Sequence, residues 1–216
     1  MDHTRHEGIF NVAPLSVTIV GAGGIGAITA MALAKMGVGY LNIIDGDVVS
    51  DVNLATQFHA LESLGLPKVD ALQAEIMRYA DGTDVIAEQG RVEPDGYLYG
   101  NIVIAAVDSI ASRKAIWSAV CRGKSQWFID ARMAAEEYHQ YAVDMREGWD
   151  WYGKIITRED DANVQDLPCT AKATFYTACM SAGHLGAAVR MIATGLRPPR
   201  YTVHNIIAGS LITIRE

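Results

Sequence analysis

The chain has 216 residues, of which 50% are hydrophobic and 20% are charged, and its formal net charge is −7. This length and composition are typical of one globular domain with a full core, and the acidic balance argues against nucleic acid as the main partner. No apolar run reaches the roughly 18 residues that span a bilayer, and residues 1–10 lack a signal-peptide pattern. We therefore expect no membrane association.

The first clear element is an apolar strand at residues 15–20, followed by the turn Gly21-Ala22-Gly23-Gly24-Ile25-Gly26. Gly21 permits a tight turn, Gly23 lets the backbone approach a phosphate, and Gly26 lets a helix pack closely on the strand. A helix is predicted over residues 24–36, and its N-terminus would offer free N–H groups to an anion. The pattern predicts a nucleotide-binding turn, although a glycine turn can also simply join a strand to a helix.

A second strand at residues 40–45 ends in Asp45, about 20 residues after the glycines, where a ribose-binding acid is found in such folds. Asp45 could alternatively be a turn acid. Further strands are predicted at 83–88, 101–107 and 126–130, and helices at 67–80 and 110–122. This alternation predicts a mainly parallel sheet with helices on both faces.

The pattern changes after residue 130. Residues 138–145 and 201–214 are typical of strands that add to the sheet in antiparallel orientation. Residues 146–170 are polar and show no clean period, so we expect a long loop or crossover. Residues 171–195 predict the longest helix, rich in Ala, Gly and Met. Cys121 and Cys179 fall within apolar helical patterns, which predicts that both are buried.

The ordered motifs resemble the ubiquitin-activating-enzyme-like superfamily in its compact bacterial form, the ThiF/MoeB-type adenylyltransferases. The matching residues are the glycine turn, Asp45-Gly46-Asp47, Asn53-Leu54, Gln57, Pro67-Lys68, Asp108-Ser109 with Arg113, and Pro168-Cys169-Thr170. The match runs from about residue 10 to the C-terminus. It implies one nucleotide-binding adenylation domain over residues 1–216, with a Rossmann-like α/β fold.

The resemblance also implies roles. ATP would lie over Gly21, Gly23, Gly24 and Gly26, with Asp45 on the ribose and Asp47, Asn53, Gln57 and Lys68 in the same nucleotide-binding set. Lys68 would neutralise phosphate charge, although a solvated helix lysine is an alternative. Asp108 would hold Mg²⁺, a hard cation that prefers oxygen ligands, or it could cap the following helix. The second substrate would be the C-terminal carboxylate of a small ubiquitin-like or sulfur-carrier protein ending in Gly-Gly, which is ionised at pH 7 and needs no general base.

The chain departs from the family pattern at Thr56, where an arginine that stabilises phosphate charge is usual. Arg132, or Arg5 from a neighbouring subunit, could replace it, but Arg132 could equally form an ion pair with Glu136. The two CxxC pairs that bind structural zinc in many members are missing, so no zinc is expected. With three cysteines and no CxxC pair, we expect no disulfide framework and a reducing, cytoplasmic location.

Cys169 precedes the predicted helix at 171–195, where a thiol pKa would be lowered, so the resemblance implies a nucleophile that could form a thioester. A small apolar residue at a helix start is the alternative. Three functions stay open at this point. They are an ATP-dependent adenylyltransferase, which we favour, an NAD-dependent oxidoreductase, and a non-catalytic subunit of a heterodimeric activating enzyme. The resemblance also implies a homodimer.

Overall fold

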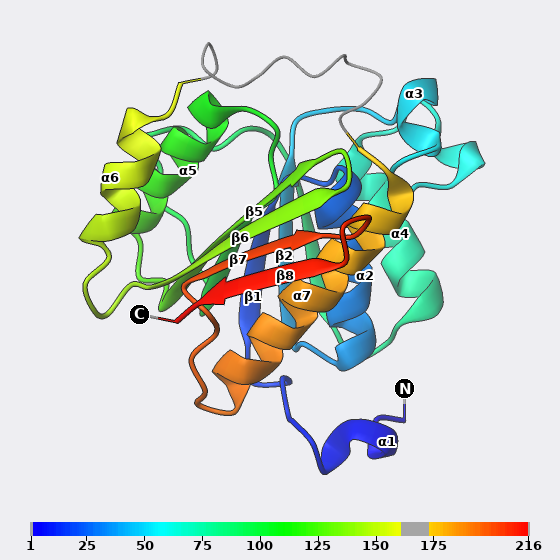
Figure 1. The fold of residues 1–216 in the computed structure, drawn as a ribbon. Helices are drawn as coiled ribbons and strands as arrows, with labels where there is room; N and C mark the ends of the chain where they lie inside the picture. Colours follow the sequence, from blue (N-terminus) through cyan, green and yellow to red (C-terminus); the bar gives the residue numbers. More distant parts are fainter. Residues whose placement is uncertain (1, 161–172, 216) are drawn as a thin grey trace.

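The computed structural model describes residues 2–160 and 173–215, and its eight strands form one sheet in the order β3-β2-β1-β4-β5-β6-β7-β8 (Figure 1). The strands are β1 Ser16–Val20, β2 Tyr40–Asp45, β3 Asp84–Gln89, β4 Ile102–Ala105, β5 Trp127–Ala134, β6 Glu137–Asp144, β7 Tyr201–Asn205 and β8 Ser210–Ile214. The first five strands in this order pair in parallel, and β6, β7 and β8 follow in antiparallel orientation. The predicted fold class is confirmed.

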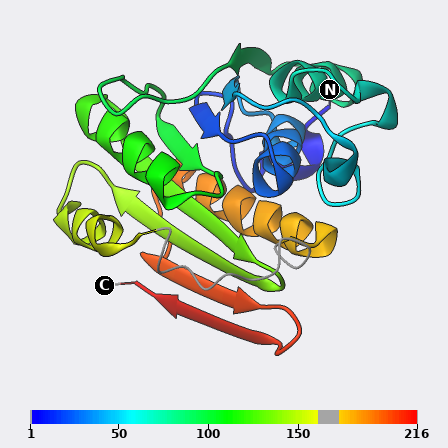
Figure 2. The same cartoon turned by 90° about the horizontal axis from the view of Figure 1, so that it is seen from above.

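The helices cover both faces of this sheet. They are α1 Thr4–Glu7, α2 Gly24–Met36, α3 Asp51–Leu54, the 3₁₀ turn η1 Leu61–Ser63, α4 Lys68–Tyr79, α5 Ile110–Arg122, α6 Asp150–Arg158 and α7 Phe175–Ala193. Helices α2, α4 and α7 pack on one face, and α5 and α6 pack on the other (Figure 2). The predicted bounds of α2 and α5 agree with the structure.

The core has two layers because the central strands are buried on both sides. In β4, Ile104 belongs to the layer under α2 and α7, whereas Val103 and Ala105 belong to the layer under α5. A strand buried on both faces is continuously apolar, which is why this segment was readable from the sequence. The β7–β8 hairpin extends the sheet beyond its helical cover (Figures 1 and 2), and every residue of β8 is exposed.

The prediction of a long loop at 146–170 is partly wrong, because helix α6 forms within it. Tyr152 and Ile156 are its buried residues, four positions apart, and both are almost fully buried. Tyr152 packs edge-on against Trp117 and Phe128, with ring centroids 4.8 and 5.3 Å apart. A helix of nine residues gives too short a pattern for a helical period to be recognised in the sequence.

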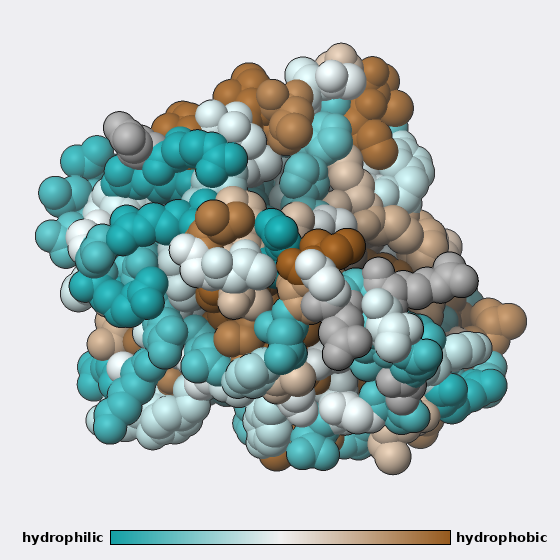
Figure 3. Space-filling view, turned by 90° about the horizontal axis from the view of Figure 1, so that it is seen from below, coloured by the Kyte–Doolittle hydropathy of each residue, from teal (hydrophilic) through white to brown (hydrophobic). Residues whose placement is uncertain are grey.

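The prediction that Cys121 and Cys179 are buried is wrong, since both thiols lie on exposed sides of their helices. Cys169 lies outside the described residues. On the face shown in Figure 3, hydrophobic residues occur in separate groups among hydrophilic ones. In the described part of the chain, no helix is both long and apolar enough to cross a membrane.

Candidate nucleotide site

The glycine turn lies between β1 and α2, where the order of the strands reverses. Gly21 has φ +103°, and a Cβ on it would lie 2.5 Å from the Ala106 carbonyl oxygen. A Cβ on Gly26 would lie only 1.7 Å from the carbonyl oxygen of Gly21. Neither position admits a side chain, so the turn is held tightly against β4. Open α/β sheets bind ligands in the crevice at such a reversal point.

Asp45 lies at the end of β2, directly beside this turn. One carboxylate oxygen accepts a hydrogen bond of 2.6 Å from the Ala22 N–H, and the other accepts one of 2.8 Å from the Asp47 N–H. A carboxylate offers about four lone-pair positions, so roughly two stay available for hydroxyl groups. The structure thus brings the predicted ribose acid into contact with the predicted phosphate turn.

Lys68 is buried, with 6% of its surface exposed. Its backbone N–H donates to the Asp47 carbonyl at 3.0 Å, and Val48 and Pro67 form an isolated bridge beside this contact. The ammonium group lies 3.3 Å from the Asp47 carboxylate. Since a buried lysine with an exposed acid beside it is not a solvated surface charge, that alternative is excluded by the structure.

The segment that carries Asn53, Thr56 and Gln57 also lies against the turn. A Cβ on Gly23 would lie 3.7 Å from the Gln57 amide nitrogen, and one on Gly24 would lie 3.5 Å from the Thr56 carbonyl oxygen. The Asn53 side-chain oxygen accepts hydrogen bonds from the N–H and hydroxyl of Ser50, the N-cap of α3, at 3.2 and 2.8 Å, so Asn53 completes a capping box there. Thr56 brings no charge to this position.

His59 contacts the turn, and the sequence analysis did not find it. It is 9% exposed, and its Nε2–H donates to the Ala22 carbonyl oxygen at 2.9 Å. Burial lowers the pKa of this imidazole, so the ring is neutral near pH 7. Ala22 is therefore held at its N–H by Asp45 and at its carbonyl by His59. A single histidine with no periodic or spacing pattern around it gave no signal in the sequence.

Asp108 follows β4 and is exposed at the same edge of the sheet as the glycine turn. It does not cap α5, because the N-cap is Ser109, whose hydroxyl oxygen accepts the Ser112 N–H at 3.1 Å. Within the described ranges, no hydrogen bond or ion pair engages the Asp108 carboxylate. An uncommitted carboxylate at this edge fits a hard divalent cation.

Arg132, the candidate substitute for the missing arginine, is held by two carboxylates. Its Nε donates to Asp130 at 2.7 Å and its Nη1 to Glu159 at 2.8 Å. These acids, rather than the expected Glu136, are its ion-pair partners. Arg113, the other arginine of the predicted motifs, is 4% exposed and also donates to Asp130. The side chain of Arg5 lies outside the described part of the structure.

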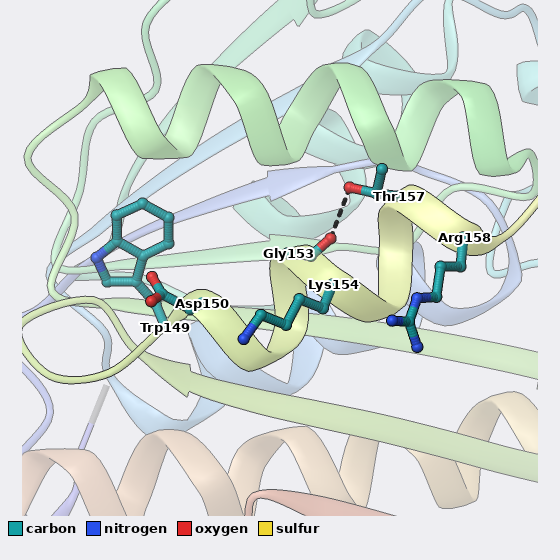
Figure 4. A pocket seen from close by; sticks show the side chains of 6 residues that line it. All are labelled: Trp149, Asp150, Gly153, Lys154, Thr157 and Arg158. Carbon is teal, nitrogen blue, oxygen red and sulfur yellow. Dashed lines mark hydrogen bonds between the residues drawn. The ribbon is translucent and has the colours of Figure 1, made fainter.

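Two cavities in the described part of the structure lie near residues of interest. One, of about 370 Å³, lies along α6 and is lined by Trp149, Asp150, Gly153, Lys154, Thr157 and Arg158 (Figure 4). None of these residues belongs to the predicted nucleotide set. The other, of about 680 Å³, is bounded by α2, α4 and the segment after α3, and Gln57 and His59 line it. No glycine of the turn is among its lining residues.

The chain belongs to the ThiF family, which residues 2–206 match. It is 40% identical over 82 residues to the tRNA threonylcarbamoyladenosine dehydratase of Bacillus subtilis strain 168, covering 38% of this chain and 32% of that protein. It is 32% identical over 127 residues to the SAMP-activating enzyme E1 of Haloferax volcanii, covering 56% of this chain and 47% of that protein. The chain thus matches less than half the length of either relative.

Solved structures have the same fold. A crystal structure of E. coli MccB with ATP superimposes with a TM-score of 0.73 at 16% identity, covering 94% of this chain and 64% of that one. A crystal structure of PaaA superimposes with a TM-score of 0.74 at 20% identity, again covering 94% of this chain and 64% of that one. The match to the family model and to these relatives confirms the resemblance to the ThiF/MoeB type.

Proposed function

We propose that this protein uses Mg-ATP to adenylate the C-terminal carboxylate of a small ubiquitin-like or sulfur-carrier protein that ends in Gly-Gly. The observation that carries the proposal is that Asp45 binds the Ala22 and Asp47 N–H groups at the reversal point of the sheet, with the buried Lys68 ammonium 3.3 Å from the Asp47 carboxylate. Family membership supports the same reaction class.

In this proposal each residue does a simple task. Asp45 accepts hydrogen bonds from the two ribose hydroxyls, and the N–H groups at the start of α2 donate to phosphate oxygens. Lys68 would supply positive charge to the phosphates, and Asp108 would hold Mg²⁺, which would supply further charge neutralisation there. The acid that attacks the α-phosphate is already ionised, so catalysis consists of positioning and charge stabilisation.

The test has two parts. Calorimetric titration of the pure protein with Mg-ATP and with NADH separates adenylation from the oxidoreductase alternative, and we expect only Mg-ATP to bind. ATP–pyrophosphate exchange is then measured with candidate carriers ending in Gly-Gly. Asp108→Ala is expected to slow exchange on the order of 10²-fold or more without loss of the fold. Exchange near the wild-type rate in this variant would remove Asp108 from the metal role.

Thr56 favours a second function, that of a non-catalytic subunit of a heterodimeric activating enzyme, because Arg132 is already engaged by Asp130 and Glu159. Thr56→Arg distinguishes the two. If the chain is catalytic without this arginine, Thr56→Arg changes exchange little. If the chain is a partner subunit that has lost activity, exchange is absent in the wild type and the substitution can restore it.

Cys169 keeps its proposed role as a thioester-forming nucleophile. Cys169→Ala should preserve ATP–pyrophosphate exchange and abolish a reductant-sensitive covalent adduct with the carrier. If the wild type forms the adenylate and no such adduct, the protein is an adenylation-only enzyme.

A further inference from the structure

Arg91 lies beside the proposed nucleotide site and belongs to none of the motifs found in the sequence. It follows β3, whose residue Gln89 is in register with Asp45, and the Gly90 N–H donates to the Asp45 carbonyl at 3.1 Å. A Cβ on Gly46 would lie 3.2 Å from Cγ and 3.5 Å from Nε of Arg91. The arginine side chain therefore lies along the backbone of the residue that follows the ribose acid.

The guanidinium group is only loosely held there. The Arg91 side chain is 78% exposed, and its Nη2 lies 3.5 Å from a carboxylate oxygen of Asp47, which is itself 55% exposed. The other Asp47 oxygen faces Lys68. Exposed ion pairs of this length contribute little to stability, so the planar guanidinium is free to contact a ligand.

The order of the strands indicates which part of a bound nucleotide would lie near Arg91. The phosphates would lie at the glycine turn after β1, and Asp45, at the end of β2, would hold the ribose. The base must then leave the ribose on the side away from the turn. That side is the end of β3, because β2 lies between β1 and β3. A planar cation next to a purine contacts its face through stacking and cation–π attraction.

We propose that Arg91 stacks on the adenine base and gives this site its preference for a nucleoside triphosphate over bare polyphosphate. This inference rests on the proposed function, since it requires ATP to bind with its ribose on Asp45. Arginine beside a ribose acid can alternatively contact the 2′-phosphate of a dinucleotide, and the experiment includes that outcome.

The experiment compares the dissociation constants of Mg-ATP and Mg-tripolyphosphate, measured by calorimetry, for wild type, Arg91→Ala and Arg91→Lys. Arg122→Ala, which removes an exposed arginine from the end of α5, is the matched control. We expect Arg91→Ala to weaken Mg-ATP about 3- to 10-fold and to leave tripolyphosphate unchanged. Arg91→Lys should retain less than half of the Mg-ATP affinity that Arg91→Ala loses, because lysine keeps the charge and lacks the planar guanidinium group.

Equal weakening of both ligands, or full rescue by lysine, would show that Arg91 acts as a phosphate charge and would overturn the inference. Unchanged ATP affinity in Arg91→Ala would do the same. NADP⁺ binding that depends on Arg91, in a protein that does not bind Mg-ATP, would assign Arg91 to a 2′-phosphate and would also contradict the proposed function. If the wild type binds Mg-ATP and the Arg91 variants bind it equally well, the role of Arg91 is contradicted and the proposed function is not.

Discussion

At the scale of single residues, the glycine turn is shaped by contacts from distant parts of the chain. Ala22 donates to Asp45 at the end of β2 and accepts from His59 in the segment after α3. Both partners lie more than 20 positions away, at separations of 23 and 37 residues. The turn is therefore positioned before any ligand arrives, which lowers the cost of binding an anion there.

The close packing of the turn gives the first prediction. Gly26→Ala should destabilise the protein strongly, because the new methyl group would lie 1.7 Å from a backbone oxygen that cannot move independently of β1. The matched control is Gly183→Ala in the middle of α7, where nothing lies within 4 Å of a new Cβ. The control should stabilise the protein by about 0.5–1 kcal/mol. Urea unfolding measures both, and a Gly26→Ala protein as stable as wild type would contradict the described packing.

His59 makes stability depend on pH. Its pKa is lowered in the folded protein by burial, so the unfolded chain binds a proton at a higher pH than the folded one. The free energy of unfolding should therefore be constant above about pH 7 and fall as pH decreases below about 6.5. His184 acts in the same direction, because burial and His204 lower its pKa.

The measurement is the free energy of unfolding of wild type and His59→Gln between pH 8 and 5. The variant is expected to be less stable at pH 8, since a buried contact to Ala22 is altered, and to show a shallower loss toward acid. Parallel pH curves for the two proteins would show that His59 does not titrate as its burial requires.

At the scale of elements, α6 is fixed by one buried polar group. Asp130 on β5 has no exposed surface, and it accepts hydrogen bonds from Arg113 on α5, from Arg132 on β5 and from the Tyr152 hydroxyl on α6. A buried carboxylate requires such partners, since an unpaired charge in the core is very costly. This cluster joins the two helices of one face to the sheet.

Tyr152→Phe tests this connection. It removes a 2.7 Å hydrogen bond to a buried charge and leaves the aromatic packing intact. The expected loss of stability is about 1.5 kcal/mol, the low end for bonds to charged groups, because two arginines still donate to Asp130. Tyr97→Phe, at a side chain that is 58% exposed, should change stability little in the same denaturation experiment. Equal stability of both variants would mean that the Tyr152 hydroxyl contributes nothing.

At the scale of the whole molecule, the exposed apolar residues indicate where a second copy could pack. Helix α7 uses much of its apolar side against α2 and the sheet. Leu61 and Met77 are 78% and 71% exposed, on η1 and α4. These two elements are joined by the Glu62–Arg78 ion pair at 3.7 Å. A second copy that covered η1 and α4 would remove both apolar side chains from water.

We therefore expect a homodimer, with a mass of two chains in light scattering at micromolar concentration. The double variant Leu61→Glu, Met77→Glu should be monomeric if these elements form the interface, because each carboxylate would lose its hydration there. Leu211→Glu, on the exposed strand β8, is the control and should stay dimeric. A wild-type mass of one chain would contradict the homodimer.

Local patterns in the sequence were enough to predict the sheet, the turn and most of the helices. The β-branched run before Gly21 is a local pattern typical of a buried strand. Asp45 follows the glycines at the spacing that this class of fold uses for a ribose-binding acid. Helix α6 escaped prediction because its contacts are with residues distant in sequence: Tyr152 and Ile156 pack on α5 and the sheet, and the Tyr152 hydroxyl donates to Asp130. Helical propensity contributes little to such a short helix.

By itself the sequence therefore determined the α/β class, the glycine turn, Asp45 and the family, since each depends on residues that are close along the chain. Only the tertiary structure decided that His59 supports the turn, that Arg132 is engaged by Asp130 and Glu159, and that Arg91 lies beside Gly46. These contacts join segments that are far apart in sequence. They depend on how the sheet orders its strands, and no local period encodes that order.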